Sequence, residues 1–299
     1  MPAPCLRSGL PLVAAIVLAA SVSPQAKADP GRPFDTRVIQ SGHSLTDPIP
    51  PVLAGLVRAK GNVRPTIHRS TIPGSPMDWR WDHTAIPQDA RTQIADYEIL
   101  VLTERVSLSG TMPWHGSAET ALLWQSHAFA EGDGGRGAET ILYATWVSLA
   151  SGPDYVREQP HDPEAMLPFR ERLPLELARW EEILAHVNEK RDPRSPPMRM
   201  IPGPVIMAEV YDRIAAGTAP GLEAIDALFV DEIHLSAAGT YLIALAHLAV
   251  IYCTDVRGLP ADVGQPLPPD PALAAFMQDL VWEVVTTYPH AGVDRCPTS

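Results

Sequence analysis

The stretch Tyr97-Glu98-Ile99-Leu100-Val101-Leu102-Thr103 decides the fold. An apolar run without polar alternation, as at 99–102, is typical of a strand that is buried on both faces in a parallel sheet. A second run of this kind spans 139–146, and shorter β-forming segments lie at 36–41, 64–72 and 199–202. The sequence therefore predicts a sheet of short strands that other parts of the chain cover on both faces.

Apolar residues at helical spacing recur between and after these strands. The predicted helices span 48–60, 118–130, 167–190, 205–216, 235–252 and 271–288. Strands that alternate with helices predict an α/β fold, a three-layer α/β/α sandwich with a central parallel sheet. The glycine-rich stretch 132–137 lacks the Gly-Lys-Ser/Thr ending of a phosphate-binding loop, so we interpret it as an ordinary loop before a strand.

The composition of the 299 residues narrows the class of protein. Hydrophobic residues make up 45% of the chain, which allows a sizeable core and excludes a wholly disordered chain. The formal net charge of -12 and the lack of a Lys/Arg-rich run argue against a nucleic-acid partner. The 32 prolines indicate rigid loops and sharply ended helices.

The N-terminus has the three-part layout of a secretory signal peptide over residues 1–28. Arg7 precedes an apolar stretch at 10–20, and Ala26-Lys27-Ala28 forms a small-x-small cleavage pattern. Because this apolar stretch is short for a membrane span, cleavage is favoured over a retained anchor. We expect a periplasmic or secreted protein without stable membrane insertion, whose residues 29–299 form one domain with a helical extension from about 255.

Two cysteines remain after such a cleavage, Cys253 and Cys296. An oxidising compartment permits a disulfide between them, which would tie the last helical segment to the domain. Two reduced cysteines are the alternative, because pairing cannot be read from sequence spacing alone.

The candidate catalytic residues follow predicted strands, where open α/β sheets place their sites. Ser44 stands on a turn after the first strand and just before a helix, so that its hydroxyl can be exposed at the sheet edge. Asp231 lies three residues before His234 in a loop that leads into a helix, and its carboxylate can hold one imidazole nitrogen. The other nitrogen can then take a proton from Ser44, which makes a nucleophile, a base and an orienting acid.

Two blocks of the sequence carry a resemblance to a known family. Gly42-His43-Ser44-Leu45 and Asp231-x-x-His234-Leu235-Ser236-x-x-Gly239 resemble the first and last blocks of the SGNH (GDSL-type) hydrolases. The segments 144–146, 239–242 and 282–288 are similar to a carbohydrate-esterase-like branch of that family. The resemblance implies an SGNH/flavodoxin-like sandwich and a secreted serine esterase that hydrolyses acyl esters, with a carbohydrate ester as the expected substrate.

The resemblance also implies an oxyanion hole, for which the family uses two backbone N–H groups and an Asn side chain after the third strand. The backbone donors correspond to Ser44 and to Gly74, which follows the second strand. No Asn follows the third strand in this chain, so we expect the Thr103 hydroxyl, or a protonated Glu104, to be the third donor. The family's acidic residue before the nucleophile is replaced by His43.

We expect His43 and Trp146 to contact the substrate, a small-molecule or glycan ester. Trp79, Trp81 and Trp114 lie in loops near the predicted site, where buried anchors are favoured over surfaces for sugar stacking. We predict no metal site, because the histidines share no ligand spacing with cysteines or carboxylates, and the triad needs no cofactor. Two other functions stay open: an acyltransferase that uses the same triad, and a non-catalytic protein of this fold that binds polysaccharide.

Overall fold

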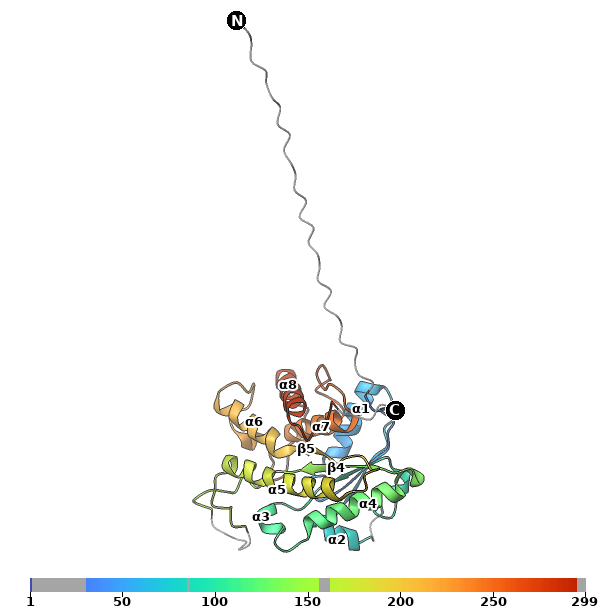
Figure 1. The fold of residues 1–299 in the computed structure, drawn as a ribbon. Helices are drawn as coiled ribbons and strands as arrows, with labels where there is room; N and C mark the ends of the chain where they lie inside the picture. Colours follow the sequence, from blue (N-terminus) through green and yellow to red (C-terminus); the bar gives the residue numbers. More distant parts are fainter. Residues whose placement is uncertain (2–30, 85–86, 156–161, 295–299) are drawn as a thin grey trace. The chain divides into compact units, whose positions relative to one another are not determined.

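The computed structural model describes Met1 and residues 31–84, 87–155 and 162–294. Within these residues, five parallel strands form one sheet in the order β2-β1-β3-β4-β5. The strands are β1 (Val38–Gly42), β2 (Ile67–Thr71), β3 (Ile99–Leu102), β4 (Glu139–Ala144) and β5 (Arg199–Pro202). Helices cover both faces of the sheet, which confirms the predicted three-layer α/β/α sandwich (Figure 1).

The sheet lies in the middle layer because neighbouring side chains of β1, β3, β4 and β5 enter two different cores. On β3, Ile99 and Val101 pack into one core, and Leu100 and Leu102 pack into the other. All four residues of β3 are buried, as its unbroken apolar run predicts.

In the described part of the chain, four helices cover the first face: α1 (Ile49–Gly61), α6 (Gly203–Ala215), α7 (Ala237–Tyr252) and α8 (Pro271–Thr287). They lie above the sheet in Figure 1. Every residue of α7 from Gly239 to Tyr252 is buried, and α7 packs between α1 and α8. A helix that is apolar on all sides is suited to such a central place.

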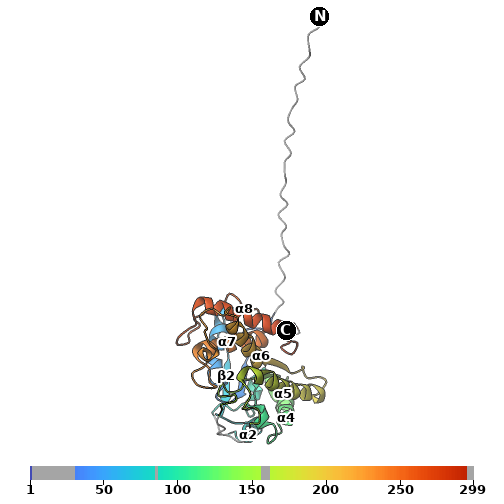
Figure 2. The same cartoon turned by 90° about the vertical axis from the view of Figure 1, so that its left-hand side faces the viewer.

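Four helices of the described residues lie on the second face: α2 (Met77–Asp82), α3 (Leu108–Thr111), α4 (Ser117–Gly135) and α5 (Phe169–Lys190). Figure 2 shows α2, α4 and α5 together on this side of the molecule. The sequence did not predict α2 and α3, because helices of six and four residues are too short to show a period. At the end of α4 the backbone leaves the helical region, with φ of 50° at Asp133 and 63° at Gly134, so the loop predicted at 132–137 begins there.

Some predictions concern residues that the structure does not describe. The predicted signal peptide, residues 1–28, lies outside the described part apart from Met1, and its cleavage stays a prediction. In the described ranges, no helix combines the length and the apolar character needed to cross a membrane. Cys253, directly after α7, is disulfide-bonded, whereas Cys5 and Cys296 both lie outside the described residues, so the pairing with Cys296 stays a prediction.

Candidate active site

Ser44 lies on the tight turn that connects β1 with α1. The Thr46 N–H donates to the His43 carbonyl (2.8 Å), and the Asp47 N–H donates to the Ser44 carbonyl (3.3 Å). Gly42 is required just before the turn, because a Cβ there would lie 2.1 Å from the Thr46 hydroxyl oxygen. This local geometry sets Ser44 at the carboxyl edge of the sheet, where α/β sheets bind ligands.

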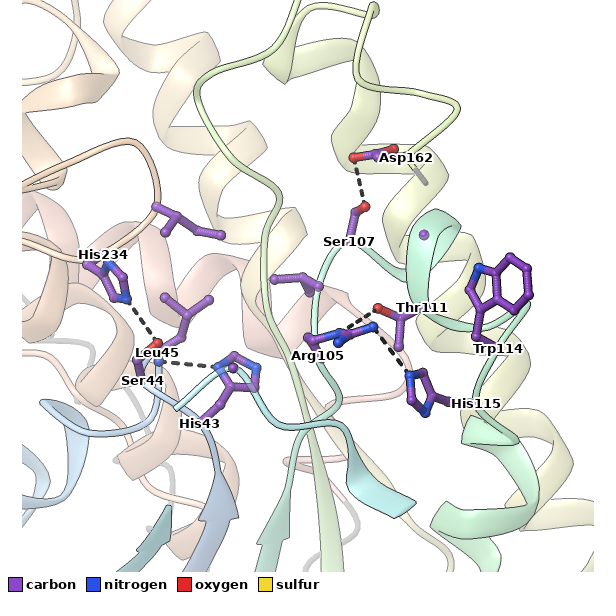
Figure 3. Close-up of a pocket in the computed structure, with 14 residues that line it drawn as sticks. His43, Ser44, Leu45, Arg105, Ser107, Thr111, Trp114, His115, Asp162 and His234 are labelled. Atoms are coloured by element: carbon purple, nitrogen blue, oxygen red, sulfur yellow. Dashed lines mark hydrogen bonds between the residues drawn. The ribbon is translucent and has the colours of Figure 1, made fainter. Parts of the chain in front are cut away.

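The structure brings Ser44, His234 and Asp231 into one hydrogen-bonded chain. Ser44 Oγ lies 2.9 Å from His234 Nε2, as Figure 3 shows, and His234 Nδ1 lies 2.8 Å from Asp231 Oδ2. The backbone N–H groups of His234 and Ile233 donate to Asp231 Oδ1 and lower the pKa of Asp231 to about 2. The carboxylate is therefore ionised at neutral pH and accepts from Nδ1, which leaves Nε2 to accept the Ser44 hydroxyl.

A cavity of about 680 Å³ opens at this edge of the sheet, within the size range of small-molecule sites. Ser44 and His234 lie at one side of it, His115 and Trp114 lie at the other, and Arg105 lies between them with its guanidinium toward His115 (Figure 3). The cavity thus has a reactive end and a distal end, and the distal end carries a cation that the sequence did not point to. Within the described ranges, no three His, Cys, Asp or Glu side chains gather as they would around a metal ion.

Two backbone N–H groups of the cavity are available as oxyanion donors. Ser44 and Gly74 both line it, and neither N–H donates to another group among the described residues. Gly74 has φ of 65° in the turn after β2, a conformation that glycine adopts without strain. Unused N–H groups beside a nucleophile are what an oxyanion hole requires.

The predicted third donors, Thr103 and Glu104, do not line the cavity. Thr103 is buried, with its methyl group next to Gly42 and its hydroxyl 3.5 Å from the Glu104 carbonyl. The buried Glu104 carboxylate turns away from the cavity to accept the N–H groups of Met77 (2.9 Å) and Arg105 (2.7 Å). The expectation that either side chain faces the oxyanion is corrected: both support the backbone beneath the site.

Trp146 also differs from its prediction. Its side chain is fully buried, packs against Phe229 and does not line the cavity. The prediction that Trp146 contacts the substrate is wrong, because the chain after β4 stays inside the core. Its indole N–H instead donates to the Ile233 carbonyl (3.0 Å), which anchors the loop between Asp231 and His234.

Ser236 and Gly239 fix the same loop against the start of α7. The Ser236 hydroxyl accepts the Gly239 N–H (3.3 Å) as the helix N-cap and donates to the Ala227 carbonyl (3.0 Å). A Cβ on Gly239 would lie 2.2 Å from the Leu228 carbonyl oxygen, so only glycine permits this close approach. Ser236 and Gly239, the part of the sequence motif that follows His234, therefore serve to hold the loop of Asp231 and His234 in place.

His43 lines the cavity, but the protein uses both of its ring nitrogens. Nδ1 accepts the Leu45 N–H (3.3 Å), so Nε2 carries the hydrogen and donates to the Glu104 carbonyl (3.0 Å). Burial, together with the nearby Arg80, lowers the pKa of His43 to about 4, so the ring is neutral at pH 7. His43 thus joins the Ser44 turn to the segment after β3, while its contact with substrate stays a prediction.

Arg80 is a site residue that sequence reasoning missed. Its buried guanidinium donates to the Ser41 hydroxyl (3.2 Å) and to the carbonyls of Ser75 and Thr103. These bonds join the ends of β1 and β3 to the turn after β2, which together carry the loops of the site. Burial lowers the pKa of Arg80 to about 10 against the opposing effect of Glu104, so Arg80 stays charged at neutral pH.

The three tryptophans predicted to lie in loops have different environments, and two of them, Trp79 and Trp81, lie in α2. Trp81 packs against the buried Trp124, as expected of an anchor. Trp79 stacks on His83, and 43% of it is exposed. Trp114 lines the cavity with 70% of its surface exposed, so its interpretation as a buried anchor is wrong.

Comparisons with known proteins show similarity of fold. No family model and no curated protein matches this chain. A DUF4886 family protein from Bacteroides uniformis is similar over 85% of this chain and 96% of its own, with 14% identity and a TM-score of 0.60. A "putative GDSL-like lipase" from Parabacteroides merdae has 13% identity over 74% of this chain and 97% of its own, with a TM-score of 0.47. The lipase Lip_vut3 from a goat rumen metagenome has 12% identity over 73% and 98%, with a TM-score of 0.39. The first likeness supports the α/β sandwich alone, and the two lipases are too distant in structure to carry an argument.

Proposed function

We propose that this protein is a serine esterase that hydrolyses acyl esters through Ser44, His234 and Asp231. The observation that carries the proposal is the 2.9 Å contact between Ser44 Oγ and His234 Nε2 at the wall of the cavity. In such an arrangement the serine is the nucleophile, and the histidine to which it is hydrogen-bonded is the general base. The ionised carboxylate holds the histidine in the orientation that proton transfer needs.

In the first half-reaction, Ser44 Oγ attacks the carbonyl carbon of the ester, and the hydroxyl proton moves to His234 Nε2. The carbonyl oxygen becomes an oxyanion, which the N–H groups of Ser44 and Gly74 stabilise. When the tetrahedral intermediate collapses, the bond to the alcohol oxygen breaks, and the alcohol leaves with the proton from His234. The acyl group stays on Ser44.

In the second half-reaction, a water molecule attacks the acyl carbon and gives a proton to His234. Collapse returns this proton to Ser44 Oγ and releases the acid, so one ester and one water give one acid and one alcohol. Asp231 stays ionised throughout and stabilises the imidazolium. With the two backbone donors that we assign among the described residues, the stabilisation of the oxyanion is weaker by about 3 kcal/mol than with a third donor.

We further propose that the substrate is an acyl ester of a carbohydrate and that the protein acts after export. The resemblance of 144–146 and 239–242 to carbohydrate esterases supports the sugar, as does an indole, Trp114, in the cavity wall. The signal-peptide layout of residues 1–28 and the disulfide at Cys253 support export.

Covalent labelling with a serine-directed fluorophosphonate, followed by mapping of the adduct, tests the esterase proposal. We expect the label on Ser44. In assays with short-chain aryl esters, we expect Ser44→Ala to lose at least about 10⁴-fold in kcat/KM with an unchanged circular dichroism spectrum.

Ser107→Ala is the matched control. Its hydroxyl belongs to the same cavity but donates to Asp162 (2.7 Å) rather than to a histidine, so the variant should still be labelled at Ser44. An unmodified Ser44, or full activity in Ser44→Ala, would contradict the proposal. Polysaccharide binding by a protein that takes no label would instead support the non-catalytic alternative.

A further inference from the structure

We propose that the cavity recognises esters that carry a carboxylate and that Arg105 binds this carboxylate. The inference rests on the proposed esterase function, because it names the substrate class of the same site. Arg105 lines the cavity from the segment that follows β3. In Figure 3 its guanidinium points away from Ser44 and toward Thr111 and His115.

Uncharged groups hold the guanidinium of Arg105 in place. Nε donates to the Thr111 hydroxyl (3.3 Å), and Nη2 donates to His115 Nε2 (3.3 Å). Since His115 accepts at Nε2, its hydrogen is on Nδ1 and goes to Asp78 Oδ2 at 2.7 Å. The described residues therefore orient Arg105 through two of its N–H groups without pairing its charge directly with an acid.

Several other buried or half-buried arginines of the described chain are paired with acids, whereas Arg91 and Arg191 bond to backbone carbonyls. Arg172 and Arg179 each form an ion pair with a carboxylate, and so does Arg199. No carboxylate of the described residues forms an ion pair with Arg105. A half-buried guanidinium is strongly stabilised by a carboxylate that it can bind with two parallel hydrogen bonds, and at Arg105 a ligand can supply that carboxylate.

The acid that shares the cavity with Arg105 is already compensated. Asp162 accepts the hydroxyls of Ser107 (2.7 Å) and Ser109 (2.8 Å) and pairs with the guanidinium of Arg172. Although burial opposes them, these groups hold the pKa of Asp162 below its usual value. The negative charge of Asp162 is thus matched by Arg172, and the charge of Arg105 is left for a ligand.

The remaining lining defines the spacer of the substrate. Leu45, Val106 and Ile233 give the cavity apolar walls. The guanidinium of Arg105 lies toward the end that Trp114 and His115 line, away from Ser44 (Figure 3). An ester with its carbonyl at Ser44 and a carboxylate some bonds away at Arg105 fits this arrangement. The carboxylate can belong to the acyl part or, as in an acylated uronic acid, to the alcohol part.

Two pairs of esters test the inference and separate these sources. The first pair compares p-nitrophenyl hemiadipate, whose carboxylate is in the acyl part, with its neutral methyl ester. The second pair compares 4-acetoxybenzoate, whose carboxylate is in the alcohol part, with its neutral methyl ester. In one pair, we expect the wild type to favour the charged ester in kcat/KM. In Arg105→Met the ratio of charged to neutral ester should fall by about tenfold or more, as expected when charge-assisted hydrogen bonds are lost. Arg105→Lys, which keeps the charge without the fork, should lose less.

Arg194→Met is the matched control. Arg194 is exposed, pairs with Asp192 in the turn after α5 and does not line the cavity, so the ratio of the two esters should stay as in the wild type. A ratio that is the same in the wild type, Arg105→Met and Arg105→Lys would overturn the carboxylate site.

Binding without turnover separates this inference from the esterase proposal. Calorimetric titration of Ser44→Ala with both charged esters should show binding that weakens by about tenfold or more when Arg105→Met is added. Arg105-dependent binding by a protein that hydrolyses neither pair would retain the carboxylate site and reject the esterase. Hydrolysis of the neutral esters, with binding that does not depend on Arg105, would retain the esterase and reject the carboxylate site.

Discussion

Each end of the cavity is lined by a histidine that is bonded to an aspartate, and the two Asp–His pairs have nearly the same geometry. At the reactive end, Asp231 Oδ2 lies 2.8 Å from His234 Nδ1. At the distal end, Asp78 Oδ2 lies 2.7 Å from His115 Nδ1. In both pairs the carboxylate fixes the tautomer of the imidazole and leaves Nε2 as the acceptor for a third side chain.

The third side chain decides what each pair can do. His234 Nε2 meets the hydroxyl of Ser44, which can give up its proton when it attacks a carbonyl. His115 Nε2 meets the guanidinium of Arg105, which donates hydrogen bonds and has no acceptor. In the functions that we propose, the same Asp–His geometry serves proton transfer at one end and positions a fixed charge at the other, so the geometry is not by itself evidence of catalysis.

The largest effects that test this comparison are expected at the reactive end. Asp231→Asn should lower kcat for a neutral aryl ester by about 10³-fold or more, because the imidazole loses its tautomer and the partner of its positive charge. His234→Ala should lose still more, about 10⁴-fold or more, because it removes the base. Initial rates at pH 7 on variants with native circular dichroism spectra measure both. A smaller loss in His234→Ala than in Asp231→Asn would contradict the roles.

The reactive pair was predictable because it is local in sequence. Asp231 and His234 are three residues apart, and the loop closes on itself through the Ile233 and His234 N–H groups. The distal pair was not predictable, since Asp78 and His115 are 37 residues apart and meet only when α2 packs beside the segment after β3. Sequence spacing predicts a pair of side chains when both lie in one turn. It does not predict a pair that forms between two segments that follow different strands.

The fold was predictable for a related reason. The apolar runs 99–102 in β3 and 141–144 in β4 are unbroken because both faces of these strands are buried. Such runs indicate strands without any knowledge of the neighbouring strand. The role of Arg80 was not predictable from such a pattern, because it is a charged residue in a six-residue helix. Its role depends on hydrogen bonds to three polar groups that lie on different strands and turns. Buried polar side chains that join several segments depend on tertiary contacts, and these contacts leave no local pattern in the sequence.

The next largest effect is on the pH dependence of stability and concerns His43, the buried histidine beside Ser44. The distal end of the cavity, around Arg105, has no such buried histidine among the described residues. Burial and Arg80 lower the pKa of His43 from 6.5 to about 4. The unfolded chain therefore binds more protons than the folded chain in this window, so the stabilisation is complete above pH 6.5 and is lost as the pH falls toward 4. Between pH 7 and pH 5 we expect this group to cost the wild type about 2 kcal/mol of unfolding free energy.

His43→Asn removes this titration while keeping a side-chain acceptor for the Leu45 N–H. Urea denaturation at both pH values should show a smaller loss in the variant, by about the same 2 kcal/mol. His247, whose pKa burial also lowers to about 4, is present in both proteins and cancels in the difference. An equal pH dependence in the two proteins would mean that His43 is not held neutral.

A smaller effect is expected at the distal end. Asp78→Asn keeps an acceptor for His115 Nδ1, and Arg105 keeps its charge, so Asp78 acts only by positioning. We expect KM for the carboxylate ester to rise about three- to fivefold with kcat nearly unchanged, the size of a weakened neutral hydrogen bond. Steady-state kinetics that separate kcat from KM check this. A loss of kcat as large as in Asp231→Asn would show that the two pairs do not differ in role.

The smallest effect is expected at Thr103, the residue that the sequence alone suggests as the third oxyanion donor. Thr103→Val keeps the methyl group beside Gly42 and removes a hydroxyl whose contact with the Glu104 carbonyl is long, at 3.5 Å. If backbone N–H groups alone hold the oxyanion, kcat should change by less than about twofold, whereas the loss of a true oxyanion donor costs about a hundredfold or more. Burst and steady-state rates with a p-nitrophenyl ester measure this directly. A hundredfold loss would mean that the hydroxyl turns into the cavity when substrate binds, so that the reactive end has a third donor after all.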